Sequence, residues 1–180
     1  LDALLKGGAE PNAKNGDGFT ALMFVAALNP SPEAFTLLLD AGAYIDAVTS
    51  EGVTALMLLA KQRQEHGVFI GSSGLASKRR EKNLLASMKT LLERGVDPLP
   101  RDKNGMRAVD YASRNRLLKG TREYRELAYV SGAPLDDTTF LKLCEFSTLY
   151  PGEIPRALKS GANPEAVNTN GTTALMLAAS

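Results

Sequence analysis

Apolar residues recur along the chain with the spacing of an amphipathic helix, and they recur within one repeated phrase. The phrase stands at residues 18–27 (GFTALMFVAA), 52–60 (GVTALMLLA) and 171–179 (GTTALMLAA). In its first copy, the apolar face at helical spacing consists of Leu22, Met23, Val25 and Ala26. Each copy therefore predicts a short helix that begins after Gly-x-Thr, where the threonine hydroxyl can accept a hydrogen bond from a free backbone N–H.

A second apolar stripe follows the first helix. The sequence NPSPE breaks that helix, because proline cannot continue it, and Ser31 can cap the next helix with Pro32 in its first turn. Phe35, Leu38 and Leu39 then predict the buried face of the second helix. Glycine in the left-handed conformation is expected to end each second helix. These glycines are Gly8, Gly42, Gly95, Gly132 and Gly161.

Two helices and a turn recur with a period near 33 residues, which predicts a stacked array of helical hairpins. One hairpin cannot bury the apolar faces of both its helices, so its neighbours must cover them. The intervals predict a half unit at 1–17, units at 18–51, 52–104 and 105–137, and further repeat sequence at 136–180. The last segment lacks the opening phrase near Thr138, so it is also a candidate start of a second array.

These motifs resemble the ankyrin repeat family, which has a Gly-x-Thr-Pro-Leu-His opening, a second helix ending Leu-Leu-x-x-Gly-Ala, and a projecting turn. The openings that match are Gly18, Thr20 and Leu22; Gly52, Thr54 and Leu56; and Gly171, Thr173 and Leu175. The departures from the pattern are alanine for proline (Ala21, Ala55, Ala174) and methionine for histidine (Met23, Met57, Met176). This TALM variant resembles bacterial ankyrin repeats. The resemblance implies an all-α solenoid of stacked helix–turn–helix units with short β-turn fingers.

One unit carries an insertion of about 20 residues at about 62–82, between its two helices. Such an insertion adds only about 1.5 kcal/mol of closure entropy. It contains the apolar run Val68-Phe69-Ile70 and the basic triplet Lys78-Arg79-Arg80. Two interpretations stay open: the segment folds back onto the array, or it meets a partner.

Residues with catalytic or metal-binding chemistry are few. His66 is the only histidine, and Cys144 is the only cysteine, with apolar neighbours that predict a buried thiol. A single imidazole cannot build a site that needs two or more, and one cysteine forms no internal disulfide. Asp136 and Asp137 would face opposite ways in an extended segment. We therefore expect no catalytic residue, no metal, no cofactor and no enzyme activity.

Charge is unevenly distributed along the chain. Residues 1–51 carry 2 Lys/Arg against 7 Asp/Glu, residues 52–126 carry 16 against 8, and residues 127–180 carry 3 against 5. The basic centre favours an acidic partner. Nucleic-acid binding is disfavoured, because the basic residues are dispersed and few aromatics lie among them. No run of 18 apolar residues exists, so no membrane span is predicted. The chain starts at Leu1 and stops mid-phrase, so we expect a piece of a longer protein.

The resemblance also implies where a partner would bind. In ankyrin repeats the exposed positions flank the repeat's glycine and lie near the end of the first helix, which together form a concave strip. An apolar row at one of these positions, namely Phe19, Val53 and Met106, either contacts a partner or packs against its own turn. The candidate partner-binding residues are Asp17, Phe19, Glu51, Val53, Lys61, Gln62, Lys103, Asn104, Met106 and Arg114.

The function expected from this resemblance is a protein–protein interaction scaffold. Two alternatives stay open, a bacterial effector that targets host proteins and a targeting arm of a larger enzyme. The sequence names neither the partner nor the compartment.

Overall fold

The computed structural model describes residues 1–62, 74–145 and 152–179. It groups them into two compact units, Leu1–Leu117 and Leu118–Ser180, which are described separately. The described residues form helices and no β-strand; one isolated bridge joins Val167 and Thr173. The all-α prediction is confirmed.

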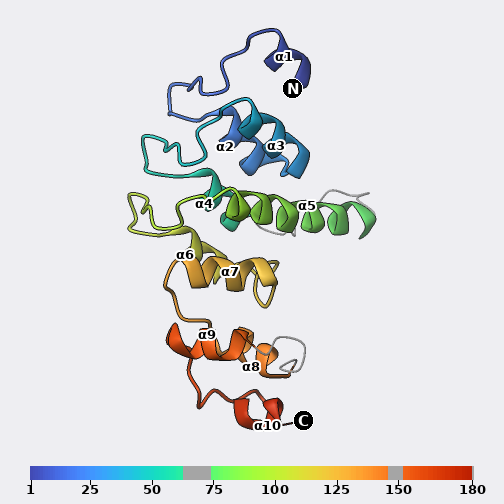
Figure 1. Cartoon of the computed structure of the whole chain (residues 1–180), viewed down its shortest axis with the longest axis vertical. Helices are drawn as coiled ribbons and strands as arrows, with labels where there is room; N and C mark the ends of the chain where they lie inside the picture. The colour runs from blue at the N-terminus through green and yellow to red at the C-terminus, as the bar shows by residue number, and fades with distance from the viewer. Residues whose placement is uncertain (63–73, 146–151, 180) are drawn as a thin grey trace. The chain divides into compact units, whose positions relative to one another are not determined.

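The first unit consists of helices arranged as hairpins (Figure 1). Its helices are α1 (Asp2–Lys6), α2 (Ala21–Leu28), α3 (Pro32–Asp40), α4 (Ala55–Lys61), α5 (Gly74–Glu93) and α6 (Ala108–Ala112). The first helices of successive hairpins stack as α2, α4 and α6, and the second helix α3 packs against α5. This stacking buries the apolar faces that the repeated phrase encodes.

The second unit contains α7 (Arg122–Val130), α8 (Asp137–Glu145), α9 (Glu153–Lys159) and α10 (Ala174–Ala178). Helix α8 packs against both α9 and α10. The array boundary predicted near residue 136 stays a prediction.

The predicted helix starts are confirmed by their hydrogen bonds. The hydroxyl oxygens of Thr20 and Thr54 accept from the backbone N–H groups three residues on, at 3.4 Å and 3.2 Å. Ser31 does the same for α3 at 3.3 Å, with Pro32 as the first helical residue. These caps satisfy N–H groups that have no partner inside the helix.

The core of the first unit lies between the stacked hairpins. Met23 and Met57 are 0% and 1% exposed, so the methionines fill the place that histidine occupies in the family pattern. Leu22, Leu56 and Phe35 are equally buried beside them. Unbranched methionine adapts to such irregular space, so Met23 and Met57 pack closely in this core.

Helix α5 differs from the other second helices in length. It has 20 residues, whereas α3 and α7 have 9 each. Its first turns, residues 74–82, belong to the predicted insertion, so this part of the insertion is helical. Val68, Phe69 and Ile70 lie outside the described residues.

Candidate binding surface

Four polar turns carry the residues that precede each first helix; they are called fingers below and comprise residues 15–19, 49–53, 102–106 and 168–172. Each finger is closed by a side-chain oxygen three residues before its glycine. In the third finger, Oδ1 of Asp102 accepts from the backbone N–H groups of Asn104 (2.9 Å) and Met106 (3.0 Å). Asn15, Thr49 and Asn168 make the equivalent pairs of bonds.

This closing residue was not among the site residues predicted from the sequence. Its signal is present, because Asn, Thr or Asp recurs three positions before each repeated glycine. A short polar side chain is needed there to reach the two backbone N–H groups of its own turn.

Neighbouring fingers in the first unit are joined along their backbones. The N–H of Ser50 donates to the carbonyl of Asp17 at 3.1 Å, and the N–H of Lys103 donates to the carbonyl of Glu51 at 2.9 Å. The side chains of Lys103 and Glu51 also form an ion pair. Three fingers therefore make one connected edge, and their tips have a fixed spacing.

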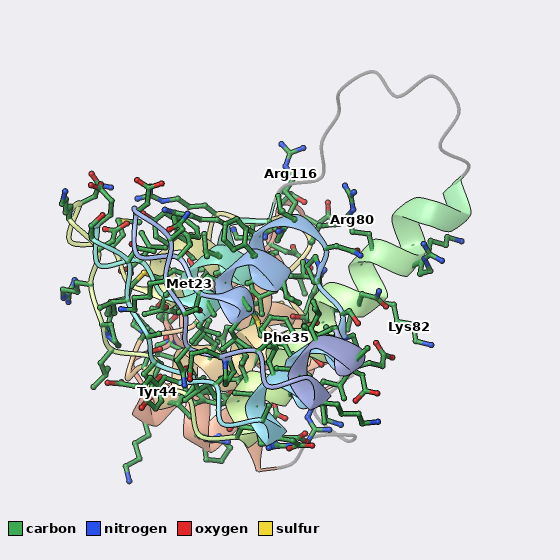
Figure 2. All side chains as sticks on the ribbon, turned by 90° about the horizontal axis from the view of Figure 1, so that it is seen from above. Met23, Phe35, Tyr44, Arg80, Lys82 and Arg116 are labelled. Atoms are coloured by element: carbon green, nitrogen blue, oxygen red, sulfur yellow. The ribbon has the colours of Figure 1, made fainter. Side chains whose placement is uncertain are left out.

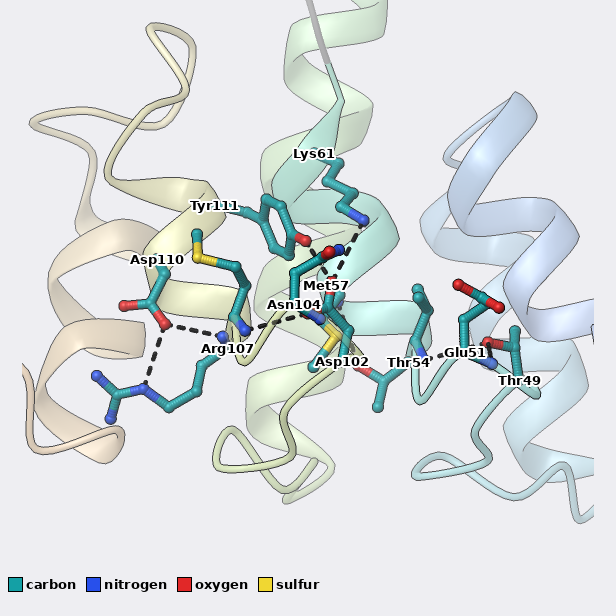
Figure 3. A network of polar contacts seen from close by, with 12 residues as sticks. Thr49, Glu51, Thr54, Met57, Lys61, Asp102, Asn104, Arg107, Asp110 and Tyr111 are labelled. Carbon is teal, nitrogen blue, oxygen red and sulfur yellow. Dashed lines mark hydrogen bonds and ion pairs between the residues drawn. The ribbon is translucent and has the colours of Figure 1, made fainter.

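Asp102 also anchors a polar network between the third finger and the first helices (Figure 3). Its Oδ2 accepts from the hydroxyl of Tyr111 on α6 and lies 3.7 Å from Nζ of Lys61 on α4. Lys61 also lies over the Tyr111 ring, 4.1 Å from its centroid. Burial by itself would raise the pKa of Asp102, but the hydrogen bonds from Tyr111, Met106 and Asn104 outweigh it and lower that pKa.

The ends of the first helices are linked by two amide side chains. Nε2 of Gln62 donates to the carbonyls of Ala26 (2.7 Å) and Ala27 (2.6 Å) at the end of α2. Nδ2 of Asn115 donates in the same way to the carbonyls of Ala60 (2.9 Å) and Gln62 (2.6 Å). Carbonyls at a helix end have no partner within the helix. The side-chain amides of Gln62 and Asn115 therefore satisfy carbonyls at the end of the first helix in the preceding repeat.

The structure places the ten predicted site residues along the fingers and the first helices of the first unit. Five of them are exposed: Asp17, Glu51, Lys103, Asn104 and Arg114. The other five are half-buried: Phe19, Val53, Lys61, Gln62 and Met106. Lys61 and Gln62 use their polar groups inside the unit, as described above, and Glu51 is paired with Lys103. Their roles in binding stay predictions.

One exposed aromatic residue on this surface was missed. Phe24 on α2 is 44% exposed, and its ring centroid lies 5.6 Å from that of Phe19. Leu28, one helical turn further along α2, is 71% exposed. Phe24 stands six residues after its glycine, where the other repeats of this unit carry Leu58 and Tyr111, so an apolar row at this position was the available signal.

Chemistry for a catalytic or metal site is sparse in the part of the chain that the structure describes. No group of three or more His, Cys, Asp or Glu residues able to hold a metal occurs there. Cys144 is buried as predicted, and burial raises the pKa of its thiol. His66 lies outside the described residues. No described helix is both long and apolar enough to cross a membrane.

A solved structure similar to this chain is an ankyrin repeat domain from Acinetobacter baumannii, with 20% identity and a TM-score of 0.47. The match covers 98% of this chain and 65% of that chain, so this chain spans less than two thirds of it. No curated protein matches the chain.

The family model for ankyrin repeats, in three copies, matches residues 1–69. Ankyrin repeats are in general protein–protein interaction modules, and the family is typically a non-enzymatic scaffold. The same Gly-x-Thr helix start, finger closure and left-handed glycine recur beyond residue 69. Residues 1–69 therefore match the ankyrin repeat family, and the later repeats share its helix starts and finger closure.

Proposed function

We propose that the first unit is a scaffold that binds another protein through its fingers and the exposed side of α2, α4 and α6. The observation that carries this proposal is the Phe19–Phe24 pair. Phe24 keeps 44% of its surface exposed although the core of the unit is complete without it. Aromatic side chains at such positions commonly contribute most to protein–protein affinity.

The fingers support the proposal through their rigidity. Backbone hydrogen bonds join the three fingers, and each finger is closed by two further bonds. A surface that is already ordered loses little conformational entropy on binding. Lys61 and Gln62 use their polar groups inside the unit, which gives them a positioning role. The better candidates for direct contact with a partner are therefore the apolar side chains Phe19 and Phe24 and the exposed charged side chains of Asp17 and Arg114.

The experiment is a quantitative pull-down that compares three baits of the whole chain. The site variant carries Phe19→Ala and Phe24→Ala. The control variant carries Tyr44→Ala and Leu99→Ala, which are 69% and 55% exposed and lie in the turns after second helices. Each bait is first checked by circular dichroism for unchanged helicity.

We expect at least one protein to be retained by the native chain and by the control, but to be lost from the site variant. With that protein purified, the site variant should bind about 30-fold more weakly, the size expected for an interfacial aromatic. Identical captured proteins on all three baits would exclude this surface as the binding site.

A further inference from the structure

The projecting end of α5 is a second feature that the finger surface does not explain. Helix α5 packs against α3 and α4 through its second half, where Leu84, Met88 and Leu91 are buried. Its first turns run on beyond these neighbours, away from the hairpin stack of the first unit (Figure 2). This end of the helix has no equivalent in α3, which has 9 residues.

Four cations occupy this projecting end. They are Lys78, Arg79, Arg80 and Lys82, and all four are exposed. None of their side chains forms an ion pair or hydrogen bond with a residue that the structure describes. By contrast, Lys89 and Arg94, further along, are paired with Glu93 and Asp40. Residues 78–82 also contain one acid, Glu81, so four cations against one carboxylate leave this end of α5 with a net formal charge of +3.

The helical positions of these cations spread the charge around the helix. Lys78 and Lys82 stand four residues apart, so they share one face. Arg79 and Arg80 follow at successive steps of about 100°. Arg80 is four residues before the buried Leu84, so it continues the core-facing stripe beyond the point where the stack ends. Arg80 and Lys82 point outward on different sides of the helix (Figure 2).

The placement of the cations is unfavourable for the helix itself. The N-terminal end of a helix carries partial positive charge, which acidic side chains normally offset. The other described second helices follow this rule, because α3, α7 and α9 have Glu33, Glu123 and Glu153 in their first turns. The first turn of α5 has no acid, and its second turn has Lys78, Arg79 and Arg80 with only Glu81 to offset them. A bound anionic group would relieve this local repulsion.

We propose that the projecting end of α5 binds an acidic segment of a partner protein, through Lys78, Arg79, Arg80 and Lys82. The site is compact, since residues 78–82 span only about 6 Å along the helix axis. Helix α3, which packs beside α5, presents the exposed acid Glu33 in its first turn, and Glu81 stands within the site itself. A long polyanion such as nucleic acid would be repelled by these neighbours, whereas a short run of glutamate or aspartate contacts the cations alone.

The test uses two variants of the whole chain with equal changes in net charge. The site variant replaces Lys78, Arg79, Arg80 and Lys82 by glutamine, which keeps helix propensity and side-chain length. The control variant replaces four exposed cations elsewhere in the first unit by glutamine: Lys6, Lys14, Lys89 and Arg101. Circular dichroism confirms that all three proteins keep the same helicity.

The probe is a fluorescent peptide of about 12 residues with six glutamates, and its binding is measured by anisotropy at about 50 and 150 mM salt. A single-stranded DNA of similar charge is measured in parallel. We expect the native chain to bind the peptide more tightly than the DNA. The site variant should lose at least about tenfold in affinity for the peptide, and the control less than about twofold.

Three results would overturn the proposal: equal weakening in both variants, no weakening in the site variant, or tighter binding of DNA than of peptide by the native chain. The Phe19→Ala/Phe24→Ala variant keeps all four cations, so it should bind the acidic peptide like the native chain. Failure of one proposal therefore leaves the other standing.

Discussion

The ammonium group of Lys61 lies 3.7 Å from Oδ2 of Asp102, so the end of α4 is tied to the finger that precedes α6. The carboxylate that receives it is buried, with 1% of its side chain exposed, and it also accepts two backbone N–H groups and the Tyr111 hydroxyl. Oδ1 of Asp102 thus accepts hydrogen bonds within its own finger, and Oδ2 interacts with Tyr111 on α6 and Lys61 on α4.

Replacing Asp102 should destabilise the third finger. Asp102→Ala leaves the N–H groups of Asn104 and Met106 without acceptors, at an expected cost of about 2–3 kcal/mol in the free energy of unfolding. Asp102→Asn keeps an oxygen for both N–H groups but loses the charge beside Lys61, so its cost should be smaller. Urea unfolding at neutral pH measures both, and an Asp102→Ala variant as stable as the native chain would refute this role.

The stability of the native chain should depend on the charge of Asp102 in acid. The folded-state pKa of this carboxyl lies below the ordinary value of 3.8, so ionisation stabilises the fold above that value. The contribution is lost as the pH falls through the lowered pKa. Between pH 5 and strongly acidic solution, the native chain should lose more stability than Asp102→Asn. Tyr111→Phe, which removes one stabilising donor, should reduce that difference.

Substitutions of two finger glycines, Gly52 and Gly105, should distinguish the cost of backbone strain from the cost of a steric clash. Gly52 and Gly105 have similar positive φ angles, 75° and 73°. A Cβ added to Gly52 would lie 3.0 Å from the carbonyl oxygen of Arg101, whereas one added to Gly105 meets nothing within 4 Å. Gly105→Ala should therefore cost about 1–2 kcal/mol from the left-handed conformation alone.

Gly52→Ala carries the same conformational cost and a clash with the next finger, which adds about 1–3 kcal/mol. Chemical denaturation of both variants gives the comparison. Equal destabilisation would mean that the fingers do not approach one another as closely as described.

The amide of Gln62 should contribute to stability as a hydrogen-bond donor. Gln62→Glu preserves shape but places a carboxylate against the carbonyls of Ala26 and Ala27, at the negative end of α2. We expect Gln62→Glu to cost more than Gln62→Ala, which loses two bonds worth about 1 kcal/mol each. Thermal unfolding at neutral pH distinguishes them, and the reverse order would contradict the proposed donor role.

The thiol of Cys144 should react slowly in the folded protein. Burial leaves this side chain 2% exposed and raises its pKa, so little thiolate forms and access is poor. Alkylation by iodoacetamide at neutral pH should be at least about tenfold slower than in denaturing urea. Equal rates would show that α8 opens readily.

Local sequence was sufficient to predict the capped starts of α2, α3 and α4, but not the start of α5, which lies inside the predicted insertion. The hydroxyl oxygens of Thr54 and Ser31 accept from backbone N–H groups three residues away, and the ring of Pro32 fixes its own φ angle at a helical value. These interactions involve residues close together in the sequence, so the helix starts can be predicted without knowing the tertiary structure. For the same reason the repeat period, the all-α class and the resemblance to ankyrin repeats were available from the sequence alone.

Tertiary structure decided how the surface residues are used. Lys61 and Gln62 were predicted to face a partner, yet their polar groups bond to residues 41 and 36 positions away. The exposure of Phe24 and the internal use of Asp102 depend on the same long-range stacking. No local pattern distinguishes a lysine that pairs across repeats from the unpaired cations on α5.

The repeated phrase itself shows the limit most directly. Leu56 and Met57 are buried at 0% and 1%, whereas Leu175 and Met176, in the same phrase, are 79% and 61% exposed. The phrase determines a capped helix with an apolar face, because those properties come from bonds within a few residues. Whether that face is buried depends on the hairpins that pack against it, and only the three-dimensional arrangement supplies them.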